Sequence, residues 1–304
     1  MSVVTAGGTR VPPATPFLVR LKRRLVVLWP FTPITLVLTL LFMIPLGIMV
    51  VYSFWTTRNL NVVSDWTLSN YIRFFTNETY LRTFGKTVLM AALVTVAALL
   101  LAVPFAYFLV RYVSARWQRT VLLAVIVPFW TSYLLRVYAW QAILGEKGAL
   151  NQFLLATGLI DAPSRLFVYN NIAVFIVLVY MYFPFAALAV YSSLEKFDFN
   201  LFRAAQDLGA RQDQAFRHIL LPAIRPGLIT ACIFVFVPVL GEYLAPTLVG
   251  GTEGVLISNL IINFFRGVQY PAGAAIAILI AAFVIVLLVI FRRYLQIEDV
   301  VARG

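Results

Sequence analysis

Long apolar stretches separated by short polar ones run along most of this chain. A helix needs about 20 apolar residues to cross roughly 30 Å of hydrocarbon, and six stretches reach that length. They are Phe31–Ser53, Thr87–Val110, Thr120–Leu144, Asn171–Tyr191, Gly227–Val249 and Ala272–Phe291. Backbone N–H and C=O groups find no water in lipid, so such segments adopt helices. The pattern therefore predicts an all-α integral membrane protein with six transmembrane helices.

The distribution of positive charge predicts the orientation, because cytoplasmic loops retain Lys and Arg. We expect a tail over 1–30, a six-helix domain over 31–291 and a second tail over 292–304. Sixteen of the 24 basic residues lie in the first tail, the loop 111–119, the loop 192–226 and the C-terminal segment. An even number of spans puts both termini on one side, which we predict to be the cytoplasm.

Composition supports a lipid environment and excludes several kinds of site. The chain is 62% hydrophobic and 12% charged, whereas soluble domains carry about 25% charged residues. Its net charge of +12 is scattered between apolar runs without a basic stripe, so we expect no nucleic-acid partner. Cys232 and His218 are single residues of their types, too few for a metal site or a Cys/His nucleophile. We therefore predict no metal, no catalytic residue and no cofactor bound by this chain.

The predicted cytoplasmic segment 192–226 is longer than the topology requires. Its charges alternate in sign and its apolar residues recur intermittently, which is typical of short amphipathic helices. We expect these helices to break near Gly209, where a glycine permits a turn, and to end at Pro222. A segment of this length in this place favours a function in contact with a cytoplasmic partner.

A spaced motif in this segment resembles a known family. Arg203-Ala-Ala-Gln-Asp-Leu-Gly209 is followed, after nine residues, by Ile219-Leu-Leu-Pro222. This resembles the EAA loop of ABC importer permeases, in which Glu-Ala-Ala, three residues and Gly precede nine residues and Ile-x-Leu-Pro. Every matched position agrees in spacing, and only Arg203 departs in type, since the family has Glu there. An ordinary amphipathic loop helix is the alternative interpretation.

Four further segments resemble the spermidine/putrescine branch of that family. They begin at Pro128 (PFWTSYLLRVYAW), Gly145 (GEKGALNQFLLATGLID), Val190 (VYSSLEKFD) and Gly241 (GEYLAPTLVGG). The resemblance implies a type I importer permease subunit of the bacterial inner membrane, with its coupling loop between helices 4 and 5. It also implies seven coupling residues: Arg203, Ala204, Ala205, Asp207, Gly209, Ile219 and Pro222.

The same resemblance implies the partners and the class of substrate. Two separate ATP-binding-cassette subunits would bind the ATP and the cytoplasmic loops of the two permeases. A second and distinct permease subunit would complete the pathway, and a periplasmic solute-binding protein would deliver the solute. The implied substrate is a polyamine or a related small organic cation. A permease for another small polar solute, of amino acid or opine type, stays open.

Two ionisable residues, Arg136 and Glu242, fall inside the predicted spans, where charge is costly and usually faces a partner or a wet cavity. Along a continuous helix from Arg119, Arg136 would lie about 25 Å away, toward the outer face, and Glu242 would reach a similar depth. Three interpretations are open. The two side chains form a structural pair, Glu242 lines a cation pathway with aromatic residues, or Arg136 extends to the lipid headgroups. The candidate pathway residues are Trp130, Tyr133, Arg136, Trp140, Glu242 and Tyr243.

Two other classes of protein, a secondary carrier and a membrane-embedded enzyme, would require different sequence features. A secondary carrier would transport without an ATPase and would hold its coupling residues inside the spans. A membrane-embedded enzyme would need a clustered catalytic set, and the single histidine has no serine nucleophile motif beside it. Gly85-Lys86-Thr87 lacks the preceding glycine of a phosphate loop, because position 80 is Tyr80. The sequence therefore favours a transport subunit that does not itself hydrolyse ATP.

Overall fold

The computed structural model describes residues 32–164 and 167–301, so the predicted tail 1–30 lies outside the described residues. It divides into two compact units, with the boundary between Val51 and Tyr52. Helix α2 (Thr32–Ser53) makes up the described part of the first unit and ends two residues past the boundary. It follows the predicted span closely and carries no charged residue. Most of its large apolar side chains are exposed, which is expected of a helix surrounded by lipid.

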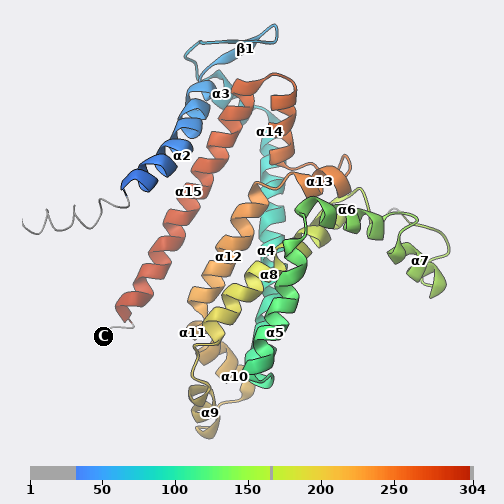
Figure 1. The fold of residues 1–304 in the computed structure, drawn as a ribbon, viewed down its shortest axis with the longest axis vertical. Coiled ribbons are helices and arrows are strands. Elements are labelled where there is room, and N and C mark those ends of the chain that lie inside the picture. The colour runs from blue at the N-terminus through green and yellow to red at the C-terminus, as the bar shows by residue number, and fades with distance from the viewer. Residues whose placement is uncertain (1–31, 165–166, 302–304) are drawn as a thin grey trace, which may run out of the picture. The chain divides into compact units, whose positions relative to one another are not determined.

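Three helices form the core of the second unit. Helices α4 (Glu78–Tyr112), α8 (Asn171–Leu194) and α12 (Arg225–Leu240) pack against one another (Figure 1). Every third or fourth residue of α4 is buried over three turns and more, and four of them are alanines: Ala91, Ala98, Ala102 and Ala106. Small side chains in one stripe let helix backbones approach closely, as is common in membrane helices.

A strand hairpin and three further helices lie beside this core (Figure 1). Strands β1 (Thr56–Arg58) and β2 (Asn61–Val63) form a hairpin, followed by α3 (Ser69–Thr76). Helices α14 (Ile257–Arg266) and α15 (Tyr270–Val301) pack against each other. The backbone of α15 continues through Val301, beyond the predicted end of the sixth span at Phe291, into the segment assigned to the second tail.

The third predicted span is not one helix, so the expectation of a continuous Thr120–Leu144 is wrong. Helix α5 (Ala115–Ile126) and the 3-10 turn Val127–Trp130 are separated from α6 (Tyr133–Leu144), which leads to α7 (Ala149–Ala156), and the two parts meet at 92°. Pro128 removes a backbone donor. The Thr131 hydroxyl bonds the Pro128 carbonyl at 2.6 Å, which offers the chain an alternative to the helix.

The fifth predicted span, Gly227–Val249, is interrupted as well. Helix α12 ends at Leu240, three residues are not helical, and the short α13 (Leu244–Val249) follows. The N–H of Gly241 turns back to the carbonyl of Pro238 at 3.0 Å. Glu242 accepts hydrogen bonds from the first N–H groups of α13, so the break replaces the helical bonds with a cap.

Between α8 and α12 the chain forms short helices, as the sequence predicts. Helix α9 (Phe199–Asp207) is followed by α10 (Gln212–Ala215), a π turn (Phe216–Leu220) and α11 (Leu221–Ala223). The break falls at Gly209, as expected. Pro222 does not end the helical path, because it occupies the first turn of α11, where its missing N–H costs nothing. The chain bends by 67° at Ile224 and continues into α12.

Within the described residues, four helices are long and apolar enough to cross a membrane. The number rises to six if each bent pair, α5–α7 and α10–α12, counts as one span. The second of the four, α4, begins at Glu78 rather than at the predicted Thr87, so Gly85-Lys86-Thr87 lies within a helix and not in a loop.

Candidate functional site

Helix α9 has one buried face and one exposed face. Asp198 caps it, because its carboxylate accepts the N–H of Asn200 at 2.9 Å. Phe202 points into the protein with 5% of its surface exposed, whereas Leu208 is 90% exposed. The predicted coupling residues Arg203, Ala204 and Asp207 are exposed and Ala205 is half-buried. The exposed face therefore mixes small, charged and large apolar side chains.

Gly209 ends α9 in a left-handed conformation, with φ of +93°. Its N–H donates to the carbonyl of Gln206 at 2.9 Å, and the N–H of Ala210 donates to the carbonyl of Ala205 at 3.0 Å. This is the Schellman pattern of helix ends, which favours glycine. A Cβ at this position would meet no atom within 4 Å, so the conformation and not the available space requires glycine.

Aromatic contacts attach the segment to the end of α4. The ring of Tyr107 lies 6.2 Å from that of Phe199 and 6.1 Å from that of Phe216, between ring centroids. Arg111 lies over the Phe199 ring at 5.7 Å. Leu220 is buried, and the predicted coupling residues Ile219 and Pro222 are half-buried beside it in sequence. Helix α9 is therefore packed against α4 through aromatic rings and joined to α12 through the following short helices.

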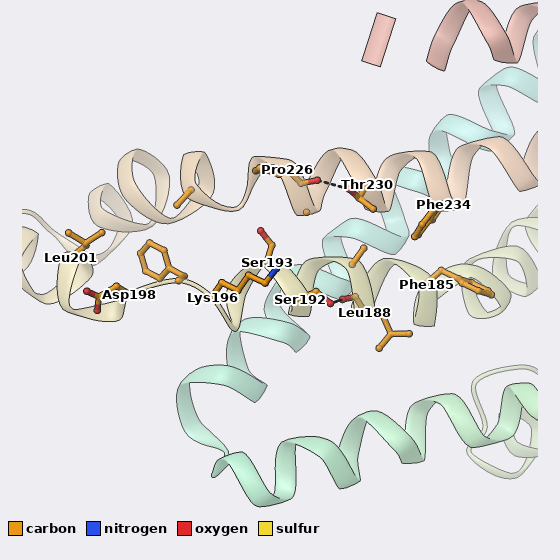
Figure 2. Close-up of a pocket in the computed structure, with 14 residues that line it drawn as sticks. Phe185, Leu188, Ser192, Ser193, Lys196, Asp198, Leu201, Pro226, Thr230 and Phe234 are labelled. Atoms are coloured by element: carbon orange, nitrogen blue, oxygen red, sulfur yellow. Dashed lines mark hydrogen bonds between the residues drawn. The ribbon is translucent and has the colours of Figure 1, made fainter. Parts of the chain in front are cut away.

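A groove of about 810 Å³ runs between α8 and α12 and reaches the start of α9 (Figure 2). Phe185 and Phe234 lie at one end, and Lys196 and Leu201 lie at the other. Most of its lining is apolar, and the hydroxyl of Thr230 is bonded to its own helix at 2.8 Å. No α4 residue lines it. The groove thus opens on the side of the helix pair that α4 leaves uncovered.

Glu242 lies in the break between α12 and α13 and is buried, with 8% of the residue exposed. Its Oε2 accepts hydrogen bonds from the hydroxyls of Tyr133 on α6, at 2.6 Å, and of Tyr182 on α8, at 3.0 Å. Its Oε1 accepts from the backbone N–H groups of Leu244, at 2.8 Å, and Ala245, at 3.3 Å. One carboxylate therefore connects α6, α8 and α13.

Arg136 does not pair with Glu242, so the structural-pair interpretation is wrong: no ion pair joins them in the part of the chain that the structure describes. Its guanidinium carbon lies 4.3 Å from the Phe129 ring centroid and 5.6 Å from that of Tyr133. The guanidinium is thus held by aromatic faces. The depth estimated along a continuous helix from Arg119 does not apply either, because the chain bends by 92° between these residues.

The other aromatic pathway candidates do not gather around Glu242. Trp130 is 82% exposed and Tyr243 is 41% exposed, whereas the Trp140 ring packs on that of Tyr180 at 5.2 Å. Tyr182 was not among the residues predicted from the sequence, although it bonds Glu242. A tyrosine inside an apolar span was a usable signal, because a buried hydroxyl needs a partner.

The long apolar helices and the polar loop define the class, a helical membrane protein, and sequence comparison supplies the family. The profile of the family described as "Binding-protein-dependent transport system inner membrane component" matches residues 98–298. The chain belongs to this family.

Several curated relatives are transport permeases, not enzymes. The spermidine/putrescine transport system permease protein PotB of Escherichia coli (strain K12) is 38% identical over 228 residues, which are 75% of this chain and 82% of that protein. PotB of Haemophilus influenzae is 35% identical over 75% of this chain and 79% of its own length. The inner membrane ABC transporter permease protein YdcU of Escherichia coli (strain K12) is 32% identical over 79% of both chains.

Solved structures share the fold. A chain from a bacterial ABC transporter that imports the acidic polysaccharide alginate superposes with a TM-score of 0.69 at 17% identity, covering 90% of this chain and 98% of that one. A chain from the same kind of transporter, in complex with a periplasmic protein that holds an alginate pentasaccharide, gives a TM-score of 0.70 at 17% identity, covering 88% and 93%. At this identity the likeness concerns the fold alone.

Proposed function

We propose that this chain forms half of the translocation pathway of an ATP-driven importer for polyamines such as spermidine and putrescine. The observation that carries the proposal is the 38% identity to a spermidine/putrescine permease over 75% of this chain and 82% of that one. A permease for another small polar solute is the second candidate, because relatives such as YdcU carry no substrate in their names. The chain itself holds no cofactor in this proposal, since ATP binds to the partner ATPase.

The topology that we propose has six spans, each bent helix pair counting as one. Both termini and helix α9 then lie in the cytoplasm, and the β1–β2 hairpin, α3 and α13 lie on the periplasmic side of the inner membrane. The excess of basic residues in the segments assigned to the cytoplasm supports this orientation. So does the placement of α9 and α3 at opposite ends of the second unit (Figure 1).

Helix α9 and its flanks are the proposed coupling element, which docks on one of the two ATPase subunits of the importer. Their exposed face offers Leu208 for apolar contact and Arg203 and Asp207 for charged contacts. Because Arg203 stands where the family has Glu, we propose that this position meets a complementary acidic residue on the ATPase. The ATPase can move the permease only if it binds the two permease conformations with different affinities.

The second permease subunit, distinct from this one, completes the pathway in this proposal. We propose that the second subunit packs against the groove between α8 and α12. This groove is largely apolar, and no α4 residue lines it. The exposed rings of Trp130 and Tyr243 are proposed to face the pathway, because aromatic faces suit an organic cation.

A periplasmic solute-binding protein is proposed to deliver the solute to the side of the membrane on which the hairpin and α13 lie.

Uptake by the reconstituted complex tests this function. The chain is assembled in proteoliposomes with its partner permease, the ATPase and the receptor, and ATP-dependent accumulation of spermidine, putrescine, arginine and an uncharged sugar is compared. We expect accumulation of the polyamines alone. Accumulation of arginine or the sugar instead would replace the substrate class, and accumulation by this chain without the ATPase would overturn the importer assignment.

A further inference from the structure

The carboxylate of Glu242 has no acceptor site to spare. An ionised carboxylate offers about four lone-pair sites on its two oxygens. Tyr133 and Tyr182 occupy two sites on Oε2, and the N–H groups of Leu244 and Ala245 occupy two on Oε1, at 2.6 to 3.3 Å. A substrate ammonium could bind this carboxylate only by displacing one of these donors.

Further polar contacts hold the same short helix from other sides. The Gln141 side chain on α6 donates to the carbonyl of Leu248, at the far end of α13, at 2.7 Å. Asn259 on α14 is buried and donates to the carbonyl of Tyr243 at 2.9 Å and to the Thr247 hydroxyl at 2.7 Å. Helix α13 is therefore fixed at both ends, and α6 holds it directly through Gln141 and indirectly through Glu242.

The end of α12 is tied into the same block. Leu240 is the last residue of α12, and its carbonyl accepts a hydrogen bond from the hydroxyl of Ser258 at 2.9 Å. The N–H of Ile257, the first residue of α14, donates to the hydroxyl of Thr87 on α4 at 2.9 Å. These bonds are buried, and leaving a buried donor or acceptor without a partner is costly. At the break in the fifth span, buried hydrogen bonds therefore join α14 to both α12 and α4.

We propose that Glu242 is a positioning residue, whose carboxylate fastens α13 to α6 and α8 so that they move as one block, and that it does not bind the transported cation. In Figure 1, α6 and α13 lie near the end of α12 that is distant from α9. The block's place in a transport cycle rests on the proposed function, but its mechanical cohesion does not. A displacement received at α9 and passed along α8 and α12 would therefore reach α6 and α13 together.

Two substitutions at position 242 separate positioning from cation binding. Glu242→Gln keeps one oxygen for the two α13 N–H groups and presents an NH₂ group that can donate to the tyrosine hydroxyl oxygens, but it removes the charge. Glu242→Ala removes all four hydrogen bonds of the carboxylate. The test uses the purified importer complex and measures hydrogen exchange of the α13 amides and the maximal ATP-dependent uptake rate.

We expect Glu242→Gln to retain α13 protection and uptake within about threefold of the parent complex, and Glu242→Ala to speed α13 exchange at least about tenfold and to slow uptake. Tyr133→Phe combined with Tyr182→Phe removes both hydroxyl donors and provides a second route, with faster α13 exchange expected. Retained protection in Glu242→Ala, or a loss of uptake beyond tenfold in Glu242→Gln with protection intact, would overturn the proposal. Hydrogen exchange of the α13 amides is measured without solute. A complex that transports no polyamine therefore still tests the positioning role of Glu242.

Discussion

Gly209 and Gly227 are glycines for different physical reasons. Gly209 has φ of +93° and open space around it, so a side chain there would be strained but not crowded. At Gly227 an added Cβ would lie 2.4 Å from the Cβ of Ser193, where α12 crosses α8. The first glycine shapes a proposed contact surface, and the second sets the distance between two core helices.

Gly209→Ala should weaken coupling without preventing membrane insertion. An L-residue in the left-handed region costs about 1–2 kcal/mol, which opposes the cap that ends α9. We expect uptake per ATP hydrolysed to fall several-fold in reconstituted complexes. Gly158→Ala is the matched control, because Gly158 also has positive φ and no atom within 4 Å of an added Cβ, but lies after α7. An equal fall in both variants would count against a special role for Gly209.

Gly227→Ala should destabilise the second unit by overpacking, at about 1–3 kcal/mol. We expect a lower midpoint of thermal unfolding of the purified chain in detergent. Ser193→Gly in the same chain removes the Cβ that would collide, so it should recover part of the loss. Gly85→Ala serves as the control, because a Cβ at Gly85 meets nothing within 4 Å. A Gly227→Ala chain as stable as the parent would refute the close crossing.

At the scale of elements, α9 is bound on one face and free on the other. Phe202 and the Tyr107 ring belong to the apolar core cluster or pack against it, whereas Leu208 and Leu201 expose 90% and 57% of their surfaces. Large exposed apolar side chains on an otherwise polar segment mark interaction sites. This division predicts that stability and partner binding depend on different residues of α9 and its C-cap.

Leu208→Glu should reduce the amount of ATPase that co-purifies with the permease while leaving its unfolding midpoint unchanged, because an exposed side chain contributes little to folding. Phe202→Ala should instead lower the unfolding midpoint, because emptying a buried aromatic site costs about 3–5 kcal/mol of stability. Leu159→Glu controls for added charge, since Leu159 is 69% exposed beyond α7. Normal ATPase recovery with Leu208→Glu would argue that α9 is not the contact.

At the scale of the whole molecule, the bent helix pairs decide how often the chain crosses the membrane. Hydropathy of single described helices supports four spans, and pairing α5 with α6–α7 and α10–α11 with α12 raises the number to six. With six spans, the hairpin β1–β2 and helix α9 face opposite sides of the membrane.

Cysteine labelling checks this topology. In a chain with Cys232→Ala, Ser64→Cys should react with a membrane-impermeant maleimide in intact spheroplasts, and Gln206→Cys should react only after permeabilisation. Both positions are exposed, so accessibility within the protein does not limit either reaction. Labelling of Gln206→Cys from outside would place α9 in the periplasm and remove the basis of the proposed coupling.

Local pattern was sufficient for much of this protein. The start and end of α2, the apolar course of α4, α8 and α15, and the break at Gly209 follow from hydropathy and residue type, because each depends on neighbours within a few positions. The spacing from Arg203 to Pro222 likewise identified the segment as a candidate coupling loop. The role of that segment stays a prediction.

The hydropathy pattern missed the breaks in the third and fifth spans, and only the tertiary structure decided the surroundings of the charged groups. Hydropathy counts apolar residues and does not register that Thr131 and Glu242 satisfy backbone groups in place of helical bonds. Tyr133 and Tyr182 lie 109 and 60 positions from Glu242 in sequence, so no local signal pairs them. A buried charge needs partners, but which helices supply them depends on how the chain folds back on itself.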